Sequence, residues 1–184
     1  YFTPLTKNES ALKLMLIDLS TYYIKEGDNR EYNVVEPPLG LMALLTYINN
    51  LKFGNMVNGK IYKSFIDFNS NEELVDLIRD FKPDIIGIRA MTFYRTFFHD
   101  VIAHIRGSGI LTPIIAGGPY PTASYYETLR DENIDVAIIA EGELTLADIL
   151  ERTLRNDKRF PSKEELKEIP GIAFLKNTNL SSPQ

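Results

Sequence analysis

Short continuous apolar runs recur along the chain and alternate with longer stretches in which apolar residues are spaced three or four apart. Runs of this length, bounded by polar residues or glycines, are typical of strands buried on both faces of a parallel sheet. The sequence predicts such strands at residues 12–19, 85–88, 114–116 and 135–140. A more polar, alternating run at 60–67 suits an edge strand, and 170–175 is predicted as a final edge strand or hairpin arm.

The spacing of three and four predicts helices between these strands. Two prolines start the helix predicted at 40–51, and Ser70 followed by Glu73 predicts a capping box before the next helix. Further helices are predicted at 96–106, at 125–132 and from 141 onward. The alternation implies right-handed βαβ units. The predicted fold class is α/β, a flavodoxin-like (Rossmann-like), doubly wound parallel sheet of five strands in the order 2-1-3-4-5, with a small C-terminal edge extension.

The residues that do not suit a core all follow predicted strands. They form four loops, at 20–40, 89–94, 117–122 and 141–143. In open α/β sheets, ligands bind beyond the carboxyl ends of the strands, so these loops are expected to form one rim. Gly117 and Gly118 end an apolar strand, and a glycine pair there lets a ligand or another backbone approach closely. The sequence therefore predicts a binding site at this edge.

Composition narrows the chemistry that such a site can carry. The chain has no cysteine, which excludes disulfides, thiol nucleophiles and a thiolate-held iron–sulfur cluster in this segment, and its two histidines are too few for a histidine-rich metal site. A formal charge of −5 without a basic run argues against nucleic acid. No apolar run suits a membrane helix, and the opening residues do not resemble a signal peptide. We expect a cytoplasmic domain without catalytic residues or a metal site of its own.

Several motifs follow one another in a specific order. They are Glu36-Pro37-Pro38-Leu39-Gly40-Leu41, the run 83–88, the run 115–122, Asp135-Val136 with Glu141-Gly142-Glu143, and the run 168–173. Together they resemble the N-terminal cobalamin-binding domain of cobalamin-dependent radical S-adenosylmethionine enzymes, the class that includes the anaerobic magnesium-protoporphyrin monomethyl ester cyclase. The resemblance runs from about residue 12 to residue 175, which is nearly the whole chain.

The resemblance implies a set of residues that hold cobalamin. By resemblance, Pro38, Leu39 and Gly40 would face the corrin, and Met91 and Thr92 would lie at its edge. Gly117, Gly118 and Pro119 would admit the nucleotide tail, and Glu141, Gly142 and Glu143 would border the opposite wall. A bulky and mostly neutral macrocycle suits an apolar, glycine-lined surface.

The resemblance also implies a larger protein. Residues 1–11 would be a polar lead-in, 12–156 the cobalamin-binding domain, and 157–184 a charged connection and edge strand. A following barrel domain, which this chain lacks, would bind S-adenosylmethionine and a four-iron cluster. The whole protein would catalyse methyl transfer or an oxidative cyclisation, whereas this segment alone would be non-catalytic. The chain begins without methionine, and we expect it to be a segment of something longer.

Two positions depart from the family pattern. Relatives with a protein histidine beneath the cobalt carry Asp-x-His-x-x-Gly after the first strand, but here Asp18 is followed by Leu19 and Ser20. His99 and His104 are predicted on a helix surface instead. Arg89 stands where a small polar residue is expected, and an arginine at this rim would either meet the cobalamin phosphate or pair with a carboxylate. The axial cobalt ligand stays open.

Other residues have two interpretations. Glu141 and Glu143 are either an acid/base pair or acids favoured by the helix dipole, and the second interpretation is preferred. Tyrosines near the rim either stack on a planar ligand or are half-buried packing residues. Phe93, Phe97 and Phe98 are predicted to be core. Two rival functions remain, a docking domain that has lost its ligand and a flavodoxin-like nucleotide or flavin site.

Overall fold

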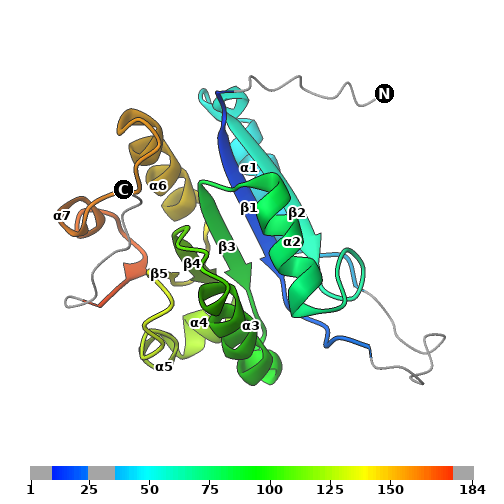
Figure 1. Cartoon of the computed structure of the whole chain (residues 1–184). Coiled ribbons are helices and arrows are strands. Elements are labelled where there is room, and N and C mark those ends of the chain that lie inside the picture. Colours follow the sequence, from blue (N-terminus) through cyan, green and yellow to red (C-terminus); the bar gives the residue numbers. More distant parts are fainter. Residues whose placement is uncertain (1–9, 25–35, 176–184) are drawn as a thin grey trace.

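A six-stranded sheet forms the centre of the protein, in a computed structural model that describes residues 10–24 and 36–175 (Figure 1). The strand order is β2-β1-β3-β4-β5-β6, and all neighbours are parallel except β5 and β6. The strands are β1 Leu12–Asp18, β2 Val57–Lys63, β3 Ile85–Arg89, β4 Ile114–Gly117, β5 Val136–Ile138 and β6 Ile172–Ala173. The predicted flavodoxin-like order and the edge extension are confirmed.

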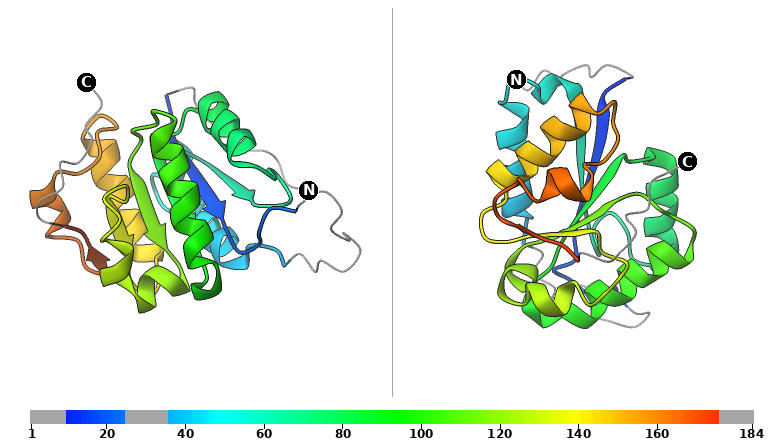
Figure 2. Two further views of the ribbon diagram at one scale, coloured as in Figure 1. Left: turned by 60° about the horizontal axis from the view of Figure 1, so that its bottom comes forward. Right: turned by 90° about the vertical axis from the view of Figure 1, so that its left-hand side faces the viewer.

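Four long helices cover the two faces of the sheet, and the edge-on view in Figure 2 (right) shows the layers. Helices α1 (Leu39–Asn49) and α6 (Glu143–Arg155) pack on one face, and α2 (Asn71–Phe81) and α3 (Arg95–Gly107) pack on the other. Shorter elements complete the described chain: η2 Gly54–Met56, η3 Thr92–Tyr94, α4 Pro119–Ala123, α5 Tyr125–Thr128 and α7 Lys163–Leu166.

The central strand β1 shows how a continuous apolar run builds two cores. Successive side chains of a strand point to opposite faces of the sheet. Leu12, Leu14 and Leu16 therefore join α1 and α6 in one cluster, whereas Met15 and Ile17 join α2 and α3 in the other. Each of these five side chains is at most 2% exposed. Burial on both faces is the reason that the middle of β1, residues 14–17, is continuously apolar.

The boundaries of several elements differ from prediction; β5, for example, spans only Val136–Ile138 of the predicted 135–140. Strand β2 spans Val57–Lys63 instead of residues 60–67, because the chain turns after Lys63, whose N–H donates to Asp67 Oδ2 at 2.7 Å. The helix predicted at 125–132 is the single turn α5, which ends at Thr128. A further short helix, α4, occupies part of the predicted loop and begins at Pro119, because proline suits a first helical position that needs no N–H donor.

Three further predictions concern capping and burial. The Ser70 hydroxyl accepts from Glu73 N–H as predicted, but the Glu73 carboxylate accepts from Asn69 N–H, so the box is only half formed. A complete capping box, which was not predicted, joins Ser162 and Glu165 at the start of α7. Phe97 and Phe98 are buried, but the prediction that Phe93 is core was wrong, since it is 75% exposed.

Candidate cofactor cleft

A cleft of about 170 Å³ opens at the carboxyl edge of the sheet, where the sequence predicted a binding site. Strands β1, β3, β4 and β5 end there, and the first turns of α1 and α6 close its sides. The cleft brings together seven of the predicted site residues: Gly40, Arg89, Gly117, Gly118, Glu141, Gly142 and Glu143. Its floor is apolar and consists of side chains on the α1 and α6 face of the sheet: Leu16, Leu41, Leu44, Ile115, Ile138 and Leu146.

The glycine pair after β4 forms one wall of the cleft. Gly118 has φ +93°, a conformation that L residues rarely adopt. A Cβ atom on Gly118 would lie 2.8 Å from Arg89 Cγ and 3.2 Å from the Ala90 carbonyl oxygen. A Cβ atom on Gly117 would meet no atom within 4 Å. Position 118 therefore requires glycine because of its backbone conformation and its close contacts, whereas the missing side chain of Gly117 keeps the cleft open.

The last residues of three adjacent strands form a buried ion network beside this wall. In the sheet register, Asp18 lies between Lys63 of β2 and Arg89 of β3. The Asp18 carboxylate accepts from Lys63 Nζ at 2.8 Å and from Arg89 Nη1 at 2.9 Å. Ser20 Oγ donates to the same carboxylate at 2.9 Å. Arg89 thus pairs with a carboxylate, which was one of its two predicted partners, and Ser20 occupies the place of the family histidine.

The opposite wall is the start of α6. Gly142 is the N-cap residue of that helix, and Glu143 lies in its first turn, where a carboxylate is favoured by the helix dipole. A Cβ atom on Gly142 would come no closer than 3.7 Å to Ile138 and 3.8 Å to Leu44, which is ordinary contact. The positions of Glu141 and Glu143 at a helix start agree with the interpretation that the helix dipole favours acidic residues there.

The other five predicted site residues lie outside the cleft. Leu39, Met91 and Thr92 are exposed beside it, Pro119 starts α4, and Pro38 lines a separate hollow with Met42 and Ile61. Leu39 is 67% exposed and Met91 39%, and Phe93 in the same loop is 75% exposed. These three exposed apolar side chains at the carboxyl edge of the sheet are termed the rim. Phe93, which is predicted to be core, instead lies exposed in the same loop as Met91.

The size of the cleft limits what it holds. Pockets that enclose a drug-sized molecule measure about 300–1,000 Å³. At about 170 Å³, this cleft admits a slim group and not a macrocycle. A corrin ring would therefore lie on the exposed rim, with only its tail inserted between the glycine wall and α6. The apolar floor and the unblocked Gly117 fit such a tail.

Both histidines lie on α3, the helix predicted to carry them. The His99 side chain is half-buried, with its Nδ1 2.6 Å from Asp131 Oδ2 and its Nε2 2.9 Å from the Tyr120 hydroxyl. His104 Nε2 lies 3.8 Å from Glu72 on the helix surface, as expected. Among the residues that the structure describes, no cluster of three or more acidic or histidine side chains is arranged to hold a metal ion.

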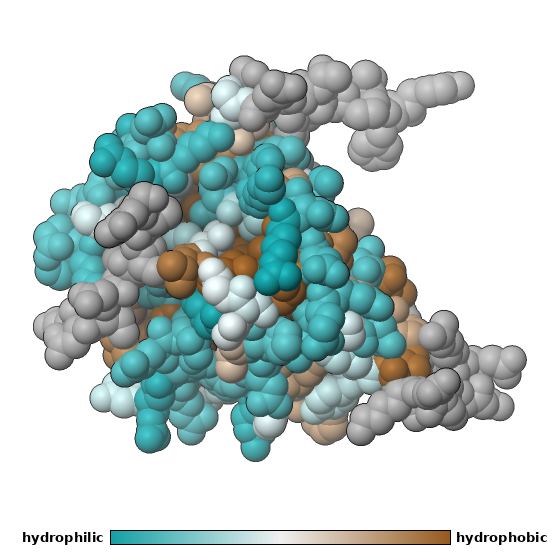
Figure 3. Space-filling view, viewed as in Figure 1, coloured by the Kyte–Doolittle hydropathy of each residue, from teal (hydrophilic) through white to brown (hydrophobic). Residues whose placement is uncertain are grey.

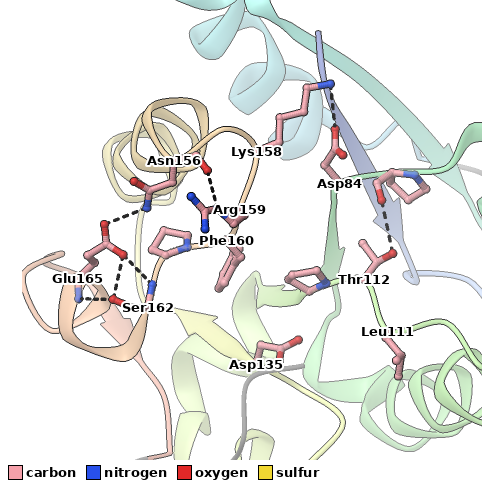
Figure 4. Close-up of a pocket in the computed structure, with 13 residues that line it drawn as sticks. Asp84, Leu111, Thr112, Asp135, Asn156, Lys158, Arg159, Phe160, Ser162 and Glu165 are labelled. Carbon is pink, nitrogen blue, oxygen red and sulfur yellow. Dashed lines mark hydrogen bonds and ion pairs between the residues drawn. The ribbon is translucent and has the colours of Figure 1, made fainter. Parts of the chain in front are cut away.

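A larger groove of about 740 Å³ lies at the amino edge of the sheet, opposite the cleft (Figure 4). Apolar side chains stand among hydrophilic ones on this face of the molecule (Figure 3). The carboxylates in the groove have partners inside the protein. Asp135 accepts from Arg106 at 2.8 Å, Glu165 accepts from Asn156 at 2.9 Å, and Asp84 accepts from Lys13 N–H at 2.7 Å. Since α/β sheets bind ligands at the carboxyl edge, the smaller cleft is the better candidate.

Comparison with known proteins decides the family. The family model described as "B12 binding domain" matches residues 29–150, about two thirds of the chain. The chain belongs to the B12-binding domain family. An uncharacterized methyltransferase, PH0819 of Pyrococcus horikoshii, is 25% identical over 169 residues, which cover 90% of this chain and 34% of that protein. This B12-binding domain therefore spans about a third of the length of that curated relative.

Two solved structures share the fold of this B12-binding domain. The cobalamin-dependent S-adenosylmethionine radical enzyme OxsB, with aqua-cobalamin and S-adenosylmethionine bound, superposes with a TM-score of 0.69 at 16% identity, covering 94% of this chain and 22% of OxsB. The radical S-adenosylmethionine methyltransferase TsrM from Kitasatospora setae, with cobalamin and a 4Fe–4S cluster bound, gives a TM-score of 0.67 at 13% identity, covering 94% and 30%. No helix in the described parts of the chain has the length and apolar character needed to cross a membrane.

Proposed function

We propose that this domain binds cobalamin, with the nucleotide tail in the carboxyl-edge cleft and the corrin over the rim. The observation that carries the proposal is the open wall at Gly117, which faces an apolar floor at the edge where this sheet type binds ligands. Membership in the B12-binding domain family favours cobalamin over a flavin or a nucleotide, and over a docking domain without a ligand.

Named residues would hold the cofactor in this arrangement. Leu39, Met91 and Phe93 would contact the corrin from the rim, together with Pro38, Gly40 and Thr92. The wall of Gly117, Gly118 and Pro119 would face that of Glu141, Gly142 and Glu143 across the tail. Bound cobalamin supplies a cobalt centre for methyl transfer or radical chemistry. The domain itself would bind and orient the cofactor. Arg89, fixed by Asp18, would keep a cation beside the glycine wall.

We further propose that the domain serves a longer enzyme. Residues 12–156 would be the cofactor-binding unit, residues 1–11 a lead-in, and 157–184 the connection to a radical S-adenosylmethionine domain that holds S-adenosylmethionine and the iron–sulfur cluster. The start of this connection is anchored to the unit, since Leu166 is fully buried and Ile169 is 4% exposed. The relative named as a methyltransferase supports methyl transfer as the reaction, ahead of oxidative cyclisation. We further propose that this enzyme acts in the cytoplasm.

A matched pair of glycine substitutions tests the placement of the tail. Gly117→Phe would add a ring at the cleft wall, where a Cβ meets no atom within 4 Å. Gly107→Phe is the control, since Gly107 also has open space around its Cβ and ends α3, outside the cleft. We expect Gly117→Phe to raise the dissociation constant for cobalamin at least tenfold, measured from the visible spectrum, and Gly107→Phe to leave it unchanged. Unchanged affinity in folded Gly117→Phe would refute the placement. Gly118→Val should likewise weaken binding, because a Cβ there would lie 2.8 Å from Arg89 Cγ and displace the wall.

A further inference from the structure

The glycine wall of the cleft depends on a helix too short to be stable alone. Helix α4 has five residues, Pro119–Ala123, whereas isolated helices need about 12–15 residues even with favourable sequences. It starts directly after Gly118, and its Thr122 hydroxyl accepts from Ala140 N–H at 3.1 Å. Ala140 lines the cleft with φ +65°. Helix α4 therefore links the glycine wall to the segment that enters α6.

A chain of three side chains holds α4 from the side of the protein that faces away from the cleft. Tyr120 is 2% exposed, and its hydroxyl lies 2.9 Å from His99 Nε2 on α3. His99 Nδ1 lies 2.6 Å from Asp131 Oδ2. A carboxylate only accepts hydrogen bonds, so Nδ1 carries the proton, and Nε2 of the neutral ring accepts from the tyrosine hydroxyl. Asn133 N–H donates to the other oxygen of Asp131 at 3.1 Å, which fixes the carboxylate.

The rings and the backbone reinforce this arrangement. The Tyr120 ring packs edge-on against both His99 and Phe98, with centroids 5.7 and 5.8 Å apart. Tyr120 N–H donates to the Ala90 carbonyl at 3.1 Å, the same oxygen that would lie 3.2 Å from a Cβ on Gly118. The orientation of Tyr120 therefore sets the position of the wall two residues before it.

We propose that the chain Asp131–His99–Tyr120, termed the clamp, positions the glycine wall for cofactor binding, a role that rests on the proposed cobalamin function. His99 and Tyr120 are positioning residues that act through α4 and do not touch the cofactor. The clamp needs the hydrogen bond at Nε2 in particular, because only this bond reaches α4. Asp131 orients the ring and selects its tautomer.

Two substitutions at one position separate the two hydrogen bonds. The amide of His99→Gln would lie near the place of Nε2 and keep the bond to Tyr120, whereas the shorter amide of His99→Asn would lie near Nδ1 and keep only Asp131. We expect His99→Asn and Tyr120→Phe to weaken cobalamin binding about tenfold, and His99→Gln to restore most of the affinity. Val75→Ala is the control, since it truncates a side chain on α2 that is 3% exposed without touching α4.

Amide hydrogen exchange of the ligand-free chain gives a second readout. We expect the Tyr120 and Ala140 amides to exchange about tenfold faster in His99→Asn, relative to core amides, and at the wild-type rate in Val75→Ala. Equal affinities and equal protection in His99→Asn and wild type would overturn the clamp, as would a His99→Gln variant as weak as His99→Asn. If the wild-type chain does not bind cobalamin, the proposed function fails, and the exchange rates alone then decide the clamp.

Discussion

Asp18 is a buried carboxylate that pairs with two cations, Lys63 and Arg89. Replacing it tests how much these ion pairs contribute to stability. The carboxylate is 1% exposed, and the Lys63 side chain that it pairs with is 5% exposed. Asp18→Asn keeps the shape and removes the charge, which leaves the Lys63 ammonium buried without a counter-charge. Breaking a buried pair in this way costs about 3–5 kcal/mol of unfolding free energy.

The local contacts place the expected loss at the lower end of that range. Ser20 Oγ still accepts from Lys63 Nζ at 2.6 Å, and the Arg89 side chain, 24% exposed, can turn toward water. We expect a loss of about 3 kcal/mol, which corresponds to a melting temperature lower by roughly 6–12 °C for a chain of this size. Urea denaturation followed by circular dichroism measures the loss directly.

Control variants isolate the pair from other effects. Lys63→Met should cost less than Asp18→Asn, because Asp18 keeps its bonds to Arg89 and Ser20. The double variant should lose less than the sum of the single losses, with a coupling of about 0.5–3 kcal/mol. Asp76→Asn, which removes an exposed pair with Arg79, should stay within about 0.5 kcal/mol of wild type. A loss under about 1 kcal/mol in Asp18→Asn, or strict additivity in the double variant, would refute the buried-pair reasoning.

Two further outcomes follow from the core and the clamp. Phe98→Ala should cost about 3–5 kcal/mol in urea denaturation because Phe98 is fully buried, whereas Phe93→Ala should change stability by less than about 0.5 kcal/mol because that side chain is 75% exposed; similar losses in both would contradict the assigned burial. Burial acts to raise the pKa of Asp131, but hydrogen bonds from His99 and Asn133 outweigh it and lower the pKa below its usual value. Its contribution to stability is therefore present above the unfolded-state pKa and is lost as the pH falls through the lower, folded value. Wild type should lose more stability than Asp131→Asn between about pH 5 and pH 3, and parallel pH curves would count against this assignment.

The strand order and the position of the cleft could be predicted because they follow from local patterns. Continuous apolar runs such as residues 14–17 mark central strands, and the rule for carboxyl edges then places Gly117 and Glu143 on one rim. Their place on opposite walls is what the family resemblance implied. Each step uses neighbours in sequence and a general property of α/β sheets. The same reasoning predicted that Phe98 is buried.

The contacts that stabilise the site depend on long-range register and could not be predicted in this way. Asp18, Lys63 and Arg89 meet because three strands pair in one register, and β2 begins three residues before the predicted start. His99 finds Tyr120 only because α4 starts at Pro119, where the sequence pattern was interpreted as a loop. The capping box at Ser162 was visible in the sequence but lies in a charged stretch without an apolar stripe.

The central claim is tested most directly by titrating the purified chain with cobalamin while the visible spectrum and the melting temperature are recorded together. A ligand that binds only the folded state stabilises it by about 2.7 kcal/mol at a concentration 100 times its dissociation constant. For a chain of this length, that corresponds to a rise of roughly 5–11 °C in the melting temperature. We predict a saturable spectral change together with such a rise. A folded chain whose spectrum and melting temperature do not respond to cobalamin would contradict the account.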